Sequence, residues 1–147
     1  VAGLRAALRR HRLTLPASHI TSTRYRIEAA RAAFRELQSR GIQPTAIIAN
    51  NDLVAMGLMM EAQAQGIRVP RQLSIVGVGA LELVGHLHPP LTTVRTPKRR
   101  IGTMAAEYLL ARIEGQDFAI PAELPLELVV RGTTATPPTA RHKDATA

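Results

Sequence analysis

The sequence contains no cysteine and very few aromatic residues. Among 147 residues there is no Cys and no Trp, and Phe and Tyr occur twice each. Without cysteine the chain can form neither disulfide bonds nor thiolate metal sites, which fits a reducing cytoplasm. Because aromatic residues make up only 3% of the chain, we expect a core built from Leu, Ile, Val, Ala and Met.

Long apolar runs and an export leader are also missing from the sequence. No apolar stretch reaches the length of a membrane span, and no charged-then-apolar segment opens the chain. The chain begins with Val1 inside a helical pattern formed by Leu4, Ala7 and Leu8, with no capping residue before it. We therefore expect a piece of a longer protein, large enough to form one domain.

Positive charge exceeds negative charge, with 19 Lys and Arg against 11 Asp and Glu, for a net charge of +8. Such an excess can indicate nucleic-acid binding. Here the arginines are scattered over predicted helices, and the only tight cluster, residues 98–100, falls in a first helical turn. The scatter favours solvated helix faces over a DNA-binding surface.

Hydrophobic periodicity predicts an α/β fold, a parallel sheet flanked by helices. Helices are expected up to about residue 11 and over 24–40, 52–65 and 97–113, and strands over 18–21, 45–49, 73–78, 91–94 and 126–131. Strands 45–49 and 73–78 should be adjacent, parallel and buried on both faces. Residues 135–147 have little to bury and should form a disordered tail.

Residues 44–57 are the most informative stretch. A buried strand is followed by Asn50, Asn51 and Asp52 and then by a helix. Ligands of open α/β sheets bind where carboxyl ends of strands meet helix starts. Asn51 is thus placed to cap the helix, to contact a small ligand, or both, whereas Asp52 is expected to act as an anion in the first turn.

Four segments, taken in order, resemble the effector-binding half of LacI/GalR transcription regulators. They are the stretch over 44–57, a helix stop and buried strand over 66–79, the run Pro-Pro-Leu-Thr-Thr-Val-Arg over 89–95, and a closing strand over 126–134. The resemblance implies a periplasmic-binding-protein-like fold, with residues 1–134 as a partial effector-binding and dimerisation domain. Most of this part would be the C-terminal subdomain.

The resemblance also implies what the rest of the molecule would contain. Helix 97–113 would belong to the N-terminal subdomain, which is otherwise missing, so its apolar stripe should be exposed in this chain. Operator DNA would be contacted only through a DNA-binding head that this chain lacks. The partners implied are a small-molecule effector, a sugar or another small metabolite, and a second copy of the chain.

The resemblance places four ligand-binding candidates. Asn51 occupies a position that often hydrogen-bonds effector, and Gly79 stands where sugar-binding members carry an aspartate. Thr21 stands where family members often carry an aromatic residue, and Thr96 stands where they often carry a longer polar side chain. With those groups absent, we expect neutral sugars to bind weakly or not at all. The alternatives are a smaller, less hydroxylated or anionic effector and a loss of sensing.

A dimer interface is expected around the loop containing Leu87 and His88, with contributions from Met56 and Met59. Met56 and Met60 fall on the predicted core face of their helix, whereas Met59 falls off it. The alternating pair His86 and His88 could face one metal ion, but zinc needs three or four ligands and no third is evident.

Other function classes have less support. No nucleophile elbow, P-loop or dinucleotide fingerprint is present, so neither catalysis nor a cofactor is expected. A fragment of a periplasmic sugar-binding transport protein of related fold remains the main alternative. The leading prediction is the ligand-sensing and dimerising part of a cytoplasmic LacI/GalR-type regulator.

Overall fold

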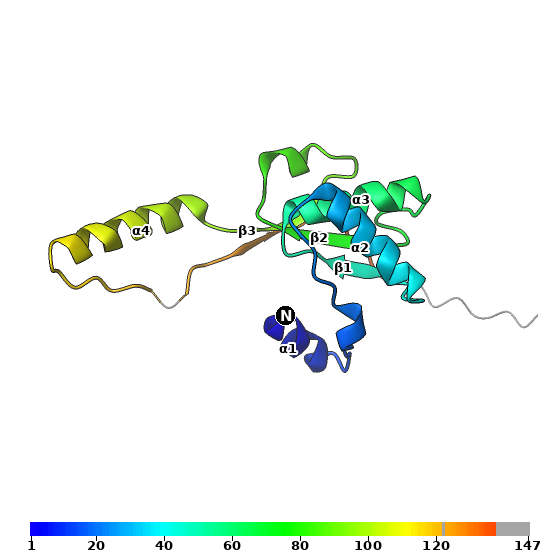
Figure 1. The fold of residues 1–147 in the computed structure, drawn as a ribbon, viewed down its shortest axis with the longest axis horizontal. Helices are drawn as coiled ribbons and strands as arrows, with labels where there is room; N and C mark the ends of the chain where they lie inside the picture. Colours follow the sequence, from blue (N-terminus) through cyan, green and yellow to red (C-terminus); the bar gives the residue numbers. More distant parts are fainter. Residues whose placement is uncertain (122, 138–147) are drawn as a thin grey trace, which may run out of the picture.

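A computed structural model describes residues 1–121 and 123–137. Figure 1 shows a body of helices and strands from which one helix stands apart. The helices are α1 (Ala2–Arg10), α2 (Ile27–Ser39), α3 (Asp52–Ala64) and α4 (Lys98–Ile113), with 3₁₀ turns η1 (Ala17–His19) and η2 (Glu82–Gly85). The strands are β1 (Ala46–Ile48), β2 (Ser74–Val78), β3 (Thr92–Arg95) and β4 (Glu127–Val129).

The strands form one sheet in the order β1-β2-β3-β4. β1, β2 and β3 are parallel, with Ile48 opposite Val76 and Val78 opposite Val94, and β4 runs antiparallel to β3. The predicted parallel pairing of strands 45–49 and 73–78 is confirmed. The fold class is also confirmed, as a mixed sheet with flanking helices.

The core lies between α2, α3 and one face of the sheet. Ala30 and Phe34 of α2 and Ala55 of α3 are at most 1% exposed, and they pack in one cluster with Ile75 of β2. α2 shows the expected helical spacing of its apolar residues. Ile75 and Gly77 of β2 face α3. This packing brings the end of β2 close to the start of α3.

Within the described residues, no helix covers the opposite face of the sheet. Ile48 is 55% and Leu128 59% exposed, and Val76, Val78 and Val94 on the same face are only half-buried. The prediction that strands 45–49 and 73–78 are buried on both faces is therefore wrong for this chain. Their apolar composition is that of strands covered twice, but α2 and α3 cover only one side.

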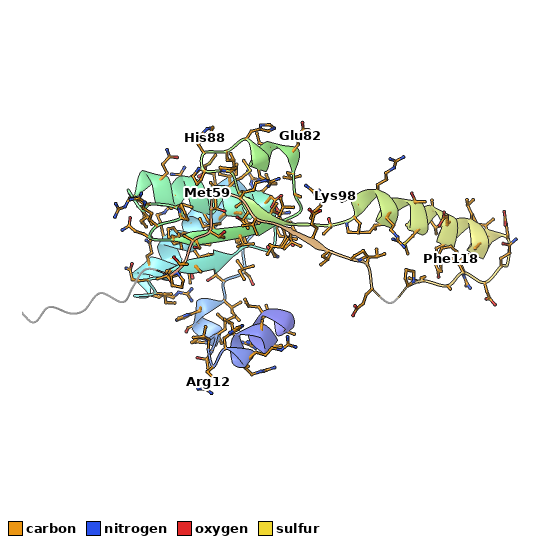
Figure 2. All side chains as sticks on the ribbon, turned by 180° about the vertical axis from the view of Figure 1, so that it is seen from behind. Arg12, Met59, Glu82, His88, Lys98 and Phe118 are labelled. Atoms are coloured by element: carbon orange, nitrogen blue, oxygen red, sulfur yellow. The ribbon has the colours of Figure 1, made fainter. Side chains whose placement is uncertain are left out.

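The strand predicted over 18–21 is also not formed. Residues Ala17–His19 form the turn η1, and an irregular segment then connects η1 to α2. A strand needs a neighbour for its backbone groups, and β1 is the edge of the sheet, with β2 as its only strand neighbour among the described residues. α1 has no buried residue and lies off the sheet in both views (Figures 1 and 2).

α4 is carried away from the body on the extended segments that contain β3 and β4 (Figure 1). Ala111 is its only buried residue, and Leu109, Leu110 and Ile113 are 60%, 58% and 81% exposed. The returning chain covers only one flank, where the rings of Tyr108 and Phe118 meet edge to face at 6.2 Å. The predicted exposure of the apolar stripe is confirmed.

The closing segment is hydrogen-bonded to the beginnings of β2 and β3. Thr133 is fully buried; its hydroxyl donates to the Ile75 carbonyl at 2.7 Å and accepts the Thr92 N–H at 2.9 Å. Ala135 bonds the Ser74 side chain at 3.2 Å, and the rest of the predicted tail, 138–147, lies outside the described residues. No helix of the described part is long and apolar enough to cross a membrane.

Candidate ligand-binding edge

The carboxyl ends of β1, β2 and β3 share one edge of the sheet, because the three strands are parallel. Asn51 follows β1, Gly79 follows β2 and Thr96 follows β3. The Gly79 N–H donates to the Val94 carbonyl at 2.9 Å, which ties the second strand end to the third. Three of the four predicted ligand-binding residues are thus brought to the edge where such sheets bind ligands.

Asn51 is the N-cap of α3. Its side-chain oxygen accepts the Leu53 N–H at 2.8 Å, an interaction that typically contributes about 1 kcal/mol. With the oxygen occupied by the helix, the Asn51 amide group remains to donate hydrogen bonds at the edge. Its neighbour Asn50 donates to the Tyr25 hydroxyl at 3.3 Å, which places a 59% exposed aromatic ring beside this edge.

Asp52 is fully buried, which sequence reasoning missed. The first-turn anion expected there would be solvated, yet Asp52 has 0% exposure. One carboxylate oxygen accepts the Thr93 hydroxyl at 2.7 Å and the other accepts the Leu81 N–H at 2.7 Å. The signal that could have found it is the glycine at 77 inside a buried strand, where a side chain would collide with this carboxylate.

The loop after β2 has an unusual backbone. Gly79 has φ +129° and Ala80 φ +49°, and a Cβ at Gly79 would lie 3.3 Å from the Asp52 carboxylate. Residues with side chains rarely adopt such a φ, so the loop in this shape does not accommodate the aspartate that the family resemblance places at this position. The edge therefore offers no free carboxylate at Gly79.

Thr21 is not brought to the edge. Its hydroxyl accepts a hydrogen bond from Arg40 at 3.0 Å, and Arg40 lies at the C-terminal end of α2. α2 and α3 run in the same direction, since Gln38 bonds Gln65 at 2.8 Å near their ends and Tyr25 bonds Asn50 near their starts. Thr21 thus lies toward the far end of the helices from Asn51.

Thr96 connects β3 to α4. It is half-buried, and its carbonyl accepts the Lys98 N–H at 2.8 Å. The exposed cations Lys98, Arg99 and Arg100 follow in the first turn of α4, which has no acidic residue. Figure 2 shows Lys98 at the junction between the body and the protruding helix.

Ion pairs between a buried Glu61 and two partly exposed arginines join α3 to α2. Glu61 is 4% exposed and accepts from Arg31 at 2.9 Å and from Arg35 at 2.6 Å. Hydrogen bonds from the Gln65 side chain and then from Arg31 hold the Glu61 pKa below its ordinary value, and the same bond raises the Arg31 pKa. These ion pairs join the two helices that begin just after Tyr25 and Asn51.

The methionines of α3 are distributed differently from the prediction. Met56 and Met59 are 6% and 9% exposed, whereas Met60 is 42% exposed. Assigning Met60 to the core and Met59 to the surface was therefore wrong, because α3 is buried around most of its circumference by α2, the sheet and the η2 loop. Leu87 packs partly against the core, and His88 is exposed on the loop above α3 (Figure 2).

No group of three or more potential metal-binding side chains occurs in the part of the chain that the structure describes. His86 and His88 are both exposed. Buried polar side-chain atoms in that part all have hydrogen-bond partners. At the edge, the Asn51 side chain offers its amide group and Thr96 its hydroxyl, whereas the N–H groups of residues 79–81 are already hydrogen-bonded.

Comparison with known proteins gives a consistent result. A family model described as periplasmic binding protein-like domain matches residues 2–134. The chain is 36% identical over 137 residues to the HTH-type transcriptional repressor PurR of Vibrio atlanticus, covering 92% of this chain and 41% of the repressor. The chain therefore spans about two fifths of the length of that relative.

Solved structures show the same relationship. A LacI family transcriptional regulator from Mycobacterium smegmatis matches with a TM-score of 0.84 and 32% identity, covering 94% of this chain and 52% of that one. The complex of the transcriptional regulator CelR with cellobiose matches with a TM-score of 0.82 and 28% identity, covering 89% of this chain and 40% of that one. Each match extends over nearly all of this chain.

Proposed function

This chain belongs to the periplasmic binding protein-like domain family as part of a LacI/GalR effector-binding domain, and on that premise we propose that it is the ligand-sensing and dimerising part of a DNA-binding transcription regulator. The protein would act in the cytoplasm and reach operator DNA through a head that is not in this chain. It would have no catalytic role.

The observation that carries the proposal is the shared edge of β1, β2 and β3. Asn51, the loop after β2 and Thr96 come together there from three separate parts of the sequence. Small ligands of open α/β sheets bind at such an edge. Nothing in this arrangement supplies a nucleophile or an acid–base pair, so recognition by hydrogen bonding is the chemistry it supports.

Sensing would operate by a shift between two conformational populations. β3 ends at the ligand edge, and the chain continues directly into the segment that leads to α4. β4 returns antiparallel beside β3. A ligand that contacts both Asn51 and the Thr96 segment would favour one angle between the body and α4. Such differential binding is what an effector needs in order to change the state of a distant DNA-binding part.

Dimerisation would use the exposed side of α3 and the loop after β2. Met60 is 42%, Leu53 36% and Leu83 56% exposed, and Leu53 and Met60 lie two helical turns apart on one face of α3. His88 is exposed on the neighbouring loop. We infer that Met60, rather than Met56 or Met59, supplies the methionine of the interface, and that Leu87, which packs partly against the core, contributes from the same loop as His88.

The effector would differ from a neutral sugar. A site that recognises hydroxyl groups uses acceptors, and here the Asp52 carboxylate is fully engaged inside the protein while Gly79 has no side chain. Each buried hydrogen bond left unmade costs roughly 1–3 kcal/mol, so two or three lost contacts would weaken binding by several powers of ten. A small acceptor-rich or anionic metabolite suits the edge better.

The genomic sequence upstream of the Val1 codon tests the regulator assignment. A helix-turn-helix segment in the same reading frame is the expected result. An export leader followed by the first half of a binding protein would instead show a periplasmic transport protein of related fold, and would overturn the proposal.

A further inference from the structure

The loop that forms the centre of the ligand edge is held by one buried group. Residues 79–81 contain two successive positive φ values, +129° at Gly79 and +49° at Ala80. For Ala80 this conformation is unfavourable unless the surroundings impose it. What imposes it is a set of hydrogen bonds that converge on Asp52 and Thr93.

Each backbone N–H of residues 79–81 donates a hydrogen bond to an acceptor on β3 or on Asp52. Gly79 donates to the Val94 carbonyl at 2.9 Å, Ala80 to the Thr93 hydroxyl oxygen at 3.3 Å, and Leu81 to the Asp52 carboxylate at 2.7 Å. The Thr93 hydroxyl in turn donates to the other Asp52 oxygen at 2.7 Å. Asp52 and Thr93 are both 0% exposed, so water does not compete for these bonds.

The glycines of β2 make room for this carboxylate. A Cβ at Gly77 would collide with one Asp52 oxygen, and a Cβ at Gly79 would lie 3.3 Å from the other. The carboxylate thus occupies the space that side chains at the end of β2 would otherwise fill. It belongs to the first turn of α3 and is hydrogen-bonded both to the loop after β2 and to β3.

We propose that Asp52 is the positioning residue of the ligand edge: through Leu81 and Thr93 it holds the 79–81 loop against β3. The inference rests on the proposed function in taking this edge as the ligand site. Since Asp52 begins α3 directly after Asn51, and Thr93 lies on the strand that leads to α4, one buried group fixes the mutual positions of all three strand ends. Asp52 itself does not touch the ligand.

Amide hydrogen exchange of the 147-residue chain, followed by NMR, tests the proposal without any ligand. The variants are Asp52→Asn, Thr93→Val and Thr93→Ser, and the control is Leu73→Ala, which truncates a buried core residue outside the hydrogen-bond set. The Ile75 amide, bonded to the Thr133 carbonyl, serves as the internal reference for global opening.

We expect Thr93→Val to raise exchange at Ala80 and Leu81 by about 10- to 100-fold relative to Ile75, because bonds to a charged group are strong ones. Thr93→Ser, which keeps the hydroxyl, should restore protection. The Leu81 N–H resonance should lie downfield in the wild-type chain and move upfield in Asp52→Asn. Leu73→Ala should speed exchange at Ile75 and at the loop equally.

The proposal is overturned if Thr93→Val and Asp52→Asn raise loop exchange relative to Ile75 no more than Leu73→Ala does, since Asp52 would then be a stabiliser of the fold alone. That outcome leaves the regulator assignment standing, because it depends on the upstream sequence. Conversely, selective loop opening would stand even if the chain proved to be a transport protein.

Discussion

The contact between α2 and α3 sets the position of the ligand edge, and Gly57 is where the two helices come closest. A Cβ added at Gly57 would lie 2.5 Å from the Ile27 carbonyl oxygen and 2.7 Å from the Ala30 Cβ. The first distance is about 1 Å short of an ordinary contact. Because the obstructing atom belongs to the α2 backbone, no side-chain rotation relieves the clash, and α2 must move away from α3.

We predict that Gly57→Ala lowers the free energy of unfolding by about 1–2 kcal/mol. Alanine gains roughly 1 kcal/mol over glycine inside a helix, but overpacking costs typically 1–3 kcal/mol and more where backbone must shift. The expected fall in Tm is about 3–8 °C. Chemical denaturation followed by circular dichroism measures the free energy directly.

Gly102→Ala is the matched control. Gly102 is also helical, in α4, but nothing lies within 4 Å of the position its Cβ would take. Only the propensity gain of up to about 1 kcal/mol remains, so helix content should rise and global stability should not fall. If Gly57→Ala proved neutral or stabilising while Gly102→Ala behaved as expected, the close α2–α3 packing, and with it the placement of the edge, would be refuted.

Further predictions concern the cap, the exposed helix and the ion pairs of Glu61. Asn51→Ala should cost about 1 kcal/mol of stability and Asn51→Asp almost none; equal losses in denaturant titrations would show that capping is not the role of the side chain in the free protein. Leu109→Lys combined with Ile113→Lys in α4 should raise the monomer fraction in analytical ultracentrifugation without loss of stability; a wild-type chain that is monomeric at high concentration would contradict the exposed stripe. Since the Glu61 pKa is lowered in the folded state, its contribution to stability is present above the unfolded pKa and is lost as pH falls through the folded value. Glu61→Gln should therefore flatten the decline of stability below about pH 4.5, and an unchanged decline would show that other carboxylates cause it.

Local sequence patterns predicted most of the elements of this fold. The helices over α2, α3 and α4 and the parallel strands β1 and β2 follow from the spacing of apolar residues and from Asn51 as a cap, which are short-range signals. The strand over 18–21 and the double burial of β1 failed for a common reason. Both depend on neighbouring elements that the local sequence does not specify, and those neighbours are absent from the described residues.

The candidate site was predictable in part. Asn51 was placed at the edge because it follows a predicted strand, and Gly79 and Thr96 were proposed from the family resemblance; in the structure each of the three follows a parallel strand. Thr21 was misplaced because its position depends on how an irregular segment packs along α2. The burial of Asp52 could not be read from its position in the chain, since its partners Leu81 and Thr93 lie 29 and 41 residues away, and long-range hydrogen bonds leave no local pattern.

The measurement that tests the central claim most directly is an NMR titration of the ¹⁵N-labelled chain with monosaccharides, nucleobases and small organic acids. We expect at least one acceptor-rich or anionic compound to perturb the resonances of Asn51, the 79–81 loop and Thr96 together. The perturbations should be weaker in Asn51→Ala, and neutral hexoses should have little effect. Saturable binding with perturbations confined to another surface, or micromolar binding of a neutral hexose, would contradict it.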